Sequence, residues 1–189
     1  MPVVEDVCGS RLKPRRKRGP IKGALAPEGA DVGRIVRRVH QSGVYFVTTD
    51  TWQKHPLFIN TTLANIVVDQ IVSCRDRGFY KLHAFVLMPD HLHVLLTPGE
   101  STTMEKAMQM VKGGSAFRIG KEKPQKFPIW HSGFHDRWMR NAQEYQGSKH
   151  YIEQNPVEAK LAESPEHYEY SSASGKFVLD ASRFDQVRG

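Results

Sequence analysis

The fold is decided by Ala84-Phe85-Val86-Leu87-Met88-Pro89-Asp90-His91-Leu92-His93-Val94-Leu95-Leu96. Its first five residues are continuously apolar, which is typical of a strand buried on both faces. Pro89 and Asp90 predict a tight turn, and the residues after them predict a second strand that pairs with the first as a hairpin. His91 and His93 are two residues apart on that strand. Their imidazoles therefore share one face, while Leu92, Val94 and Leu96 point the other way, into a core.

The segments around this hairpin alternate between strand and helix patterns. We expect a strand over 44–49, rich in β-branched and aromatic residues, and a helix over 63–71 that Gly78 ends. Further elements are expected along the rest of the chain: a helix capped by Ser101 or Thr102 that runs through Val111, short strands at 129–131 and 137–139, a helix over 142–155 interrupted by Pro156, and a short helix over 157–161. The order β-α-β-β-α-β-α predicts an α+β, ferredoxin-like antiparallel sheet with helices on one face and a further C-terminal helix.

Charge divides the chain into unequal parts. The net charge is +7 and the isoelectric point is about 9.5, which favours a polyanionic partner. Ten Lys and Arg face four acidic residues in 1–40, so that segment alone carries +6. With its prolines and glycines it reads as a basic flexible arm, either merely solvated or gripping phosphates through residues such as Arg15, Arg16, Lys17 and Arg18. The folded domain is expected over 41–175, followed by a tail over 176–189.

Composition narrows the class of protein further. Hydrophobic residues make up 39% of the chain and charged residues 25%, which are ordinary values for a globular domain. No apolar run of about 18 residues occurs, so we expect no membrane span. Cys8 and Cys74 form neither a metal motif nor a disulfide framework, and a reducing, cytoplasmic setting is expected.

The His91-Leu92-His93 pattern is the sharpest chemical feature. Two imidazoles on one face of a rigid strand supply two ligands for a divalent metal, and a third must come from elsewhere. Asp90 in the preceding turn could orient one of the rings. The alternative is a pair of ordinary surface or core histidines. Strand hydrophobicity favours apolar residues at both positions, however, and both are polar.

A second pattern is Tyr151-Ile152-Glu153-Gln154-Asn155-Pro156. On a helix Tyr151 and Asn155 lie on one face, while Ile152 turns to the core. A phenol, with an ordinary pKa of about 10, attacks phosphorus where a metal ion stabilises the developing charge. The alternatives are an ordinary tyrosine, and an asparagine that caps a helix begun by Pro156.

Together these motifs resemble the single-tyrosine HUH transposases, in particular those associated with repetitive extragenic palindromes. The resemblance runs from about Tyr45 to Ala173. It rests on five motifs in order: 86–96, Lys112-Gly113-Gly114, Trp130-His131-Ser132-Gly133-Phe134-His135-Asp136-Arg137, 151–157 and Tyr170-Ser171-Ser172. One departure is visible, because the family often has Asn before the first histidine and this chain has Asp90.

The resemblance implies a ferredoxin-like core with a C-terminal helix that carries the nucleophile, Tyr151. It implies a divalent metal, Mg²⁺ or Mn²⁺, on His91, His93 and Asn155. The implied substrate is single-stranded DNA near a hairpin, and cleavage would leave a 3′-OH and a 5′-phosphotyrosine. Both a monomer and a homodimer remain open.

Basic residues of the folded part are candidates for further DNA contacts. Lys112 and Arg118 flank two glycines that could bring the backbone close to a phosphate. Arg137 and Arg140 lie among aromatic residues, a mixture that can hold a single strand by charge and stacking, and Lys149 adjoins the tyrosine. For each segment the alternative is a solvated surface or a packed core.

Three functions follow from these patterns. The leading hypothesis is a metal-dependent nuclease and strand transferase for single-stranded DNA. The second is a catalytically silent DNA-binding regulator derived from a transposase, against which the intact His91, His93 and Tyr151 argue. The third is a metal phosphoesterase in which water replaces the tyrosine as the nucleophile.

Overall fold

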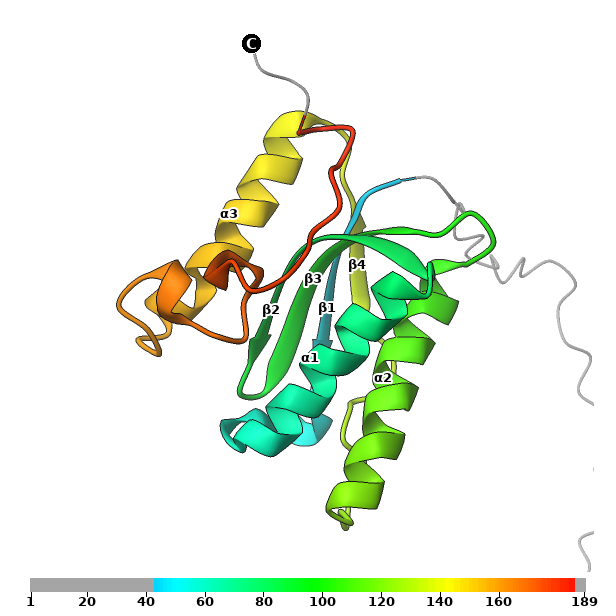
Figure 1. Cartoon of the computed structure of the whole chain (residues 1–189), viewed down its shortest axis with the longest axis vertical. Helices are drawn as coiled ribbons and strands as arrows, with labels where there is room; N and C mark the ends of the chain where they lie inside the picture. The colour runs from blue at the N-terminus through cyan, green and yellow to red at the C-terminus, as the bar shows by residue number, and fades with distance from the viewer. Residues whose placement is uncertain (1–42, 186–189) are drawn as a thin grey trace, which may run out of the picture. The chain divides into compact units, whose positions relative to one another are not determined.

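One antiparallel sheet forms the centre of the described part of the chain, residues 43–185 of this computed structural model (Figure 1). Its strands are β1 (Tyr45–Asp50), β2 (Tyr80–Met88), β3 (His91–Pro98) and β4 (His135–Trp138). They lie in the order β2-β3-β1-β4. β2 and β3 form the predicted hairpin, and β3 is an inner strand because it also pairs with β1. The predicted α+β fold is therefore confirmed.

An irregularity in β2 changes which of its side chains point to which face of the sheet. The pairing between β2 and β3 shifts between Leu82 and Ala84, as in a β-bulge. Leu82 before the shift and Phe85 after it both lie in the core on the side of α1 and α2, whereas Ala84 lies in the core on the opposite side. The strand is buried on both faces, as its continuous apolar sequence predicts.

Two helices cover one face of the sheet. α1 (Thr61–Asp76) is capped by the Asn60 side chain, and Gly78 follows its end with a positive φ of 75°. α2 (Met104–Glu122) is capped by Thr103, whose side chain accepts from the Lys106 amide. The prediction of Ser101 or Thr102 as the cap was wrong by one or two residues, because Thr103 is the residue whose hydroxyl reaches that amide.

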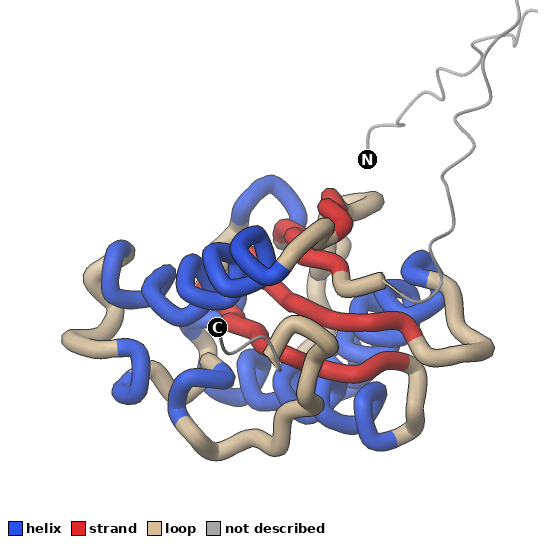
Figure 2. The backbone as a smooth tube through the Cα atoms, turned by 90° about the horizontal axis from the view of Figure 1, so that it is seen from above, coloured by secondary structure: helices blue, strands red, loops and turns tan. Residues whose placement is uncertain are grey.

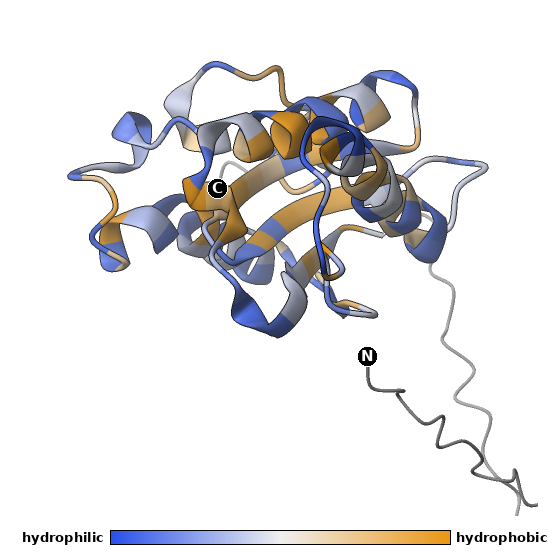
Figure 3. Ribbon diagram, turned by 90° about the horizontal axis from the view of Figure 1, so that it is seen from below, coloured by the Kyte–Doolittle hydropathy of each residue, from blue (hydrophilic) through white to orange (hydrophobic). Residues whose placement is uncertain are grey.

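α3 (Ala142–Glu158) crosses the opposite face of the sheet and packs against β2 and β3. Figure 2 shows the strands lying between helices, and in Figure 3 they form a largely hydrophobic band. Tyr145 and Ile152 are fully buried in this second core. Pro156 lies inside α3, so the predicted interruption and the separate helix over 157–161 were wrong. Near the helix end proline removes only the bond that its missing N–H would have made, and Ala159 still donates to Asn155.

The segment before β4 was also predicted incorrectly. Residues 129–131 form no strand, and only an isolated bridge joins Trp130 to Thr51. Trp130 is instead a core residue whose indole donates to Ser115 on α2. The predicted strand at 137–139 is β4, which begins two residues earlier. The short 3₁₀ turns are Trp52–Lys54, Leu57–Ile59, Pro165–His167 and Ser172–Ser174.

Residues after α3 run along the outer edge of β2. Leu87 donates its amide to Tyr170, and Asp180 accepts from the Leu82 amide and from Arg75. Phe184 completes the second core against Tyr145. Within residues 43–185 no helix is both long and apolar enough to cross a membrane.

Candidate active site

His91 and His93 lie on β3 with their rings close together. The ring centroids are 4.7 Å apart and the planes are tilted by 73°. Their neighbours across the strand pair on β1 are Asp50 and Thr48. Since β3 is an inner strand, hydrogen bonds on both sides hold the backbone that presents the two imidazoles.

A hydrogen bond to Nδ1 fixes each ring. Asp90 Oδ1 lies 2.6 Å from His91 Nδ1, and Thr48 Oγ1 lies 2.8 Å from His93 Nδ1. A carboxylate can only accept, so His91 carries its proton on Nδ1 and keeps the Nε2 lone pair for a metal. Thr48 supports the same tautomer of His93 when its oxygen accepts the bond.

Burial keeps His93 neutral. The side chain is 6% exposed. Desolvation, with the neighbouring His91 as the next contribution, lowers the pKa of His93 to about 4. A neutral imidazole is the form that binds metals, so the ring is in the required state at neutral pH without an acidic partner.

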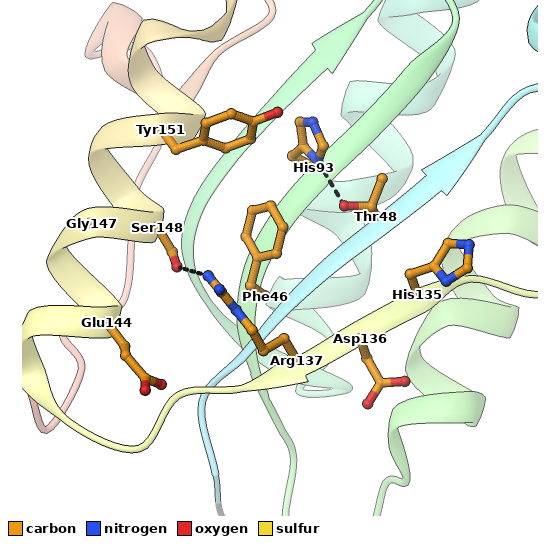
Figure 4. A pocket seen from close by; sticks show the side chains of 10 residues that line it. All are labelled: Phe46, Thr48, His93, His135, Asp136, Arg137, Glu144, Gly147, Ser148 and Tyr151. Atoms are coloured by element: carbon orange, nitrogen blue, oxygen red, sulfur yellow. Dashed lines mark hydrogen bonds between the residues drawn. The ribbon is translucent and has the colours of Figure 1, made fainter.

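α3 brings Tyr151 to the same face of the sheet. Asn141 caps the helix and Ile152 anchors it in the second core, while Tyr151 stays 44% exposed. Its ring lies 5.3 Å from the His93 ring and 6.0 Å from that of Phe46. In Figure 4 the phenol hydroxyl extends from the helix toward His93.

A pocket of about 660 Å³ opens between α3 and the sheet in front of these rings. Its lining comes from β1, β3, β4 and α3, as Figure 4 shows: Phe46, Thr48, His93, His135, Asp136, Arg137, Glu144, Gly147, Ser148 and Tyr151. The pocket therefore joins one of the paired histidines to the tyrosine within a single chain.

The donor set fits a divalent cation only if an amide joins the two imidazoles. Among residues 43–185 no group of three His, Cys, Asp or Glu side chains could hold a metal ion. Asn155 lies one turn after Tyr151 on α3 and is 9% exposed. It sits within the helix and does not cap one. Two imidazole nitrogens and an amide oxygen form a mixed set that suits Mn²⁺ well and Mg²⁺ less well.

The residues predicted to contact DNA differ in the contacts that their side chains already make within the protein. Lys112 donates to the carbonyls of His131 and Gly133 and ties α2 to that loop. Arg118 contacts Asp69 and the Ile66 carbonyl. Arg137 lines the pocket, whereas Arg140 and Lys149 do not. Arg15, Arg16, Lys17 and Arg18 lie outside the described residues.

Sequence reasoning missed Phe46, Thr48 and Ser148. Phe46 and Thr48 alternate with buried residues along β1, a signal that they share a face. That this face is the one with the histidines follows only from the pairing of Thr48 with His93. Ser148 is buried under Arg137, and nothing in its sequence context pointed to the site.

Comparisons with known proteins place the chain in a family. Residues 44–155 match the model described as "Transposase IS200 like". The fold and this match define a transposase. The chain belongs to the IS200-like transposase family. No curated protein matches it in sequence.

Two solved structures are similar to this chain, and the first of them shows the likeness of fold. A REP-associated tyrosine transposase bound to a REP hairpin has a TM-score of 0.60 at 20% identity, covering 75% of this chain and 86% of that one. A chain from Deinococcus radiodurans, provisionally described as a transposase, has a TM-score of 0.47 at 19% identity, covering 63% of this chain and 91% of that one.

Proposed function

We propose that this protein is a metal-dependent endonuclease and strand transferase that acts on single-stranded DNA near hairpins, with Tyr151 as its nucleophile. The observation that carries the proposal is the edge-to-face contact between the Tyr151 and His93 rings, whose centroids are 5.3 Å apart in the lining of an open pocket. Membership of a transposase family and the hairpin bound to the REP-associated relative support DNA as the substrate.

His91, His93 and Asn155 would hold Mg²⁺ or Mn²⁺. When bound, the cation makes the target phosphorus more electrophilic and stabilises charge on its oxygens. Asp90 and Thr48 orient the two imidazoles through their Nδ1 atoms. α3 fixes the tyrosine through the buried Ile152.

In the proposed step the Tyr151 oxygen attacks the phosphorus of a phosphodiester. A bond forms between that oxygen and phosphorus, and the bond from phosphorus to the 3′ oxygen breaks. The phenol proton leaves to solvent, and the departing oxygen takes up a proton as a 3′-OH. The 5′-phosphotyrosine retains the energy of the broken bond, so a second 3′-OH can displace the tyrosine without ATP.

Charge supports DNA binding outside the pocket. The chain carries +7, and the segment 1–40 contributes most of it. Such a segment can neutralise phosphates without reading sequence, so affinity for DNA should fall steeply with salt. The further basic contacts that we propose outside the pocket are Arg15, Arg16, Lys17, Arg18, Lys112, Arg118, Arg140 and Lys149. Arg137 is a proposed DNA contact within the pocket.

The test uses the full chain, a labelled DNA hairpin with single-stranded tails, and Mn²⁺. We expect a covalent protein–DNA adduct on a denaturing gel and its loss in Tyr151→Phe. Tyr170→Phe is the matched control, because it removes a phenol hydroxyl that does not line the pocket. A gel shift without an adduct would identify a silent regulator. Cleavage that persists in Tyr151→Phe would identify a phosphoesterase that uses water.

A further inference from the structure

Phe46 lies in the middle of the pocket and separates two chemically different ends. Its ring stacks at 5.3 Å on His93 and meets Tyr151 edge-on at 6.0 Å. On its other side the Arg137 guanidinium carbon lies 5.8 Å from the ring centroid. Figure 4 shows this arrangement, with Tyr151 and His93 at one end and Arg137 at the other.

The sheet sets the distance between these ends. Phe46 and Thr48 are two residues apart on β1, about 6.6 Å along the strand. Thr48 holds His93, and Arg137 is the cross-strand neighbour of Phe46. The base of a nucleotide whose phosphate lies beside Tyr151 would take the face of Phe46 that Arg137 now covers, and the guanidinium would move to the edge of that base. Aromatic rings hold single-stranded bases by stacking.

The far end of the pocket offers both donors and an acceptor. Arg137 donates to Ser148 Oγ at 2.9 Å, and it forms no ion pair with any residue of 43–185 although Asp136 and Glu144 line the same pocket. Guanidinium carries five N–H donors, so several remain beyond the bond to Ser148. Glu144 receives the Arg140 amide on Oε2 and is a further acceptor at this end. Such a pair can read the edge of a base.

We propose that this pocket binds the base of the single nucleotide that adjoins the cleaved phosphate. Phe46 is its stacking surface, and Arg137 is the residue that discriminates between bases. The inference rests on the proposed function, because it takes Tyr151 to mark the position of the phosphate. It goes further in assigning the binding of one base to Phe46 and the preference among bases at that position to Arg137.

The experiment uses a DNA hairpin whose single-stranded tails are randomised, with Mn²⁺ and the full chain. Sequencing of the DNA in the covalent adduct is expected to show a base preference at the position next to the cut. Arg137→Gln should reduce the preference at that position roughly tenfold and leave other positions unchanged. Arg77→Gln is the matched control. It removes the same charge and the same kind of contact with an aromatic ring, but Arg77 lies at the end of α1 over Phe79.

Phe46→Leu tests the stacking surface while keeping an apolar residue of similar size. It should weaken binding roughly tenfold, and an abasic site at the same position should weaken the wild type by a similar factor. A uniform loss of adduct across all sequences in Arg137→Gln would show a phosphate contact and overturn the proposal. So would full binding of the abasic DNA. Thermal unfolding of each variant checks that α3 and β4 remain packed.

Selection of bound DNA with Tyr151→Phe separates this inference from the proposed function. Binding requires no cleavage, so the selected pool is expected to show the same preference at one position and to lose it when Arg137→Gln is added. If the wild type forms no adduct while the pool keeps this dependence on Arg137, the cutting mechanism fails and the base pocket stands. If adducts form but the selected pool shows no base preference that depends on Arg137, the base pocket fails and the cutting mechanism stands.

Discussion

Asp90→Ala is expected to weaken Mn²⁺ binding without unfolding the protein. The Asp90 carboxylate accepts a 2.6 Å hydrogen bond from His91 Nδ1 and thereby leaves Nε2 for the metal. The substitution removes this acceptor, but it keeps the Asp90 carbonyl, which receives the amide and the hydroxyl of Thr51. The turn between β2 and β3 therefore retains its backbone bonds, and only the orientation and tautomer of His91 are released.

The magnitude follows from the role of the bond. Loss of the hydrogen-bond partner of a ligating histidine typically lowers metal affinity by about 10- to 100-fold. That corresponds to about 1.4–2.8 kcal/mol of binding free energy. The cost to folding should be smaller, below about 1 kcal/mol, because Asp90 is one-third exposed and solvent can replace its partner. Asp90→Asn keeps an oxygen acceptor and should lose less affinity than alanine.

Calorimetric titration of Mn²⁺ into Tyr151→Phe protein, with and without the Asp90 substitutions, measures the effect apart from cleavage. Asp69→Ala is the matched control, because Asp69 pairs with Arg118 on the other face of the sheet. We expect the affinity for Mn²⁺ to be highest with Asp90 intact, lower in Asp90→Asn and lowest in Asp90→Ala. Unchanged affinity in Asp90→Ala would refute the role of this carboxylate, and equal losses in both variants would refute the argument from the acceptor.

Two further predictions concern stability. A β-carbon on Gly114 would overlap the side-chain amide of Gln70, which is buried and held by its hydrogen bond to the Met110 carbonyl. Gly114→Ala is therefore expected to lower the free energy of unfolding in urea by about 1–3 kcal/mol. Gly113→Ala meets nothing and should raise it by up to about 1 kcal/mol, and equal effects would contradict the packing argument. Burial lowers the pKa of His93 to about 4 and also lowers that of His83. The unfolded chain then binds protons below about pH 6.5 that the folded chain does not, so in metal-free buffer the free energy of unfolding should fall from pH 6.5 toward pH 4, by on the order of 3 kcal/mol for His93. His93→Gln should make the fall in the free energy of unfolding with decreasing pH shallower. An unchanged pH profile in that variant would contradict the role given to His93.

The sheet was predictable because its strongest signals are local. The apolar run, the Pro89-Asp90 turn and the alternation after it determine the hairpin within thirteen residues. The predicted boundaries of strands and helices were wrong where tertiary packing outweighs local preference. The sequence Ile129-Trp130-His131 is typical of a strand, yet the Trp130 indole lies in the core and donates to Ser115. Pro156 looks like a helix end, yet α3 continues through it to Glu158.

The site was predictable only in part, for a related reason. Alternation along β3 is enough to place His91 and His93 on one face. It contains no information about which residues of β1 and β4 lie opposite them. Thr48 and Arg137 enter the site through pairings that join residues 45 and 91 positions apart. The predicted roles of Tyr151 and Asn155 came from family resemblance, and they remain proposals.

The geometry of the pocket depends on two separate attachments. The histidines are held by β3, whose backbone is bonded on both sides, and they do not depend on α3. The tyrosine depends on α3 alone, and α3 is seated by Tyr145 and Ile152 in a core that Phe184 completes. Arg137 adds a direct link from β4 to α3 through Ser148. The distance between phenol and imidazole is therefore set by packing on the second face of the sheet, so a change in that core can move the proposed nucleophile while the paired imidazoles stay in place.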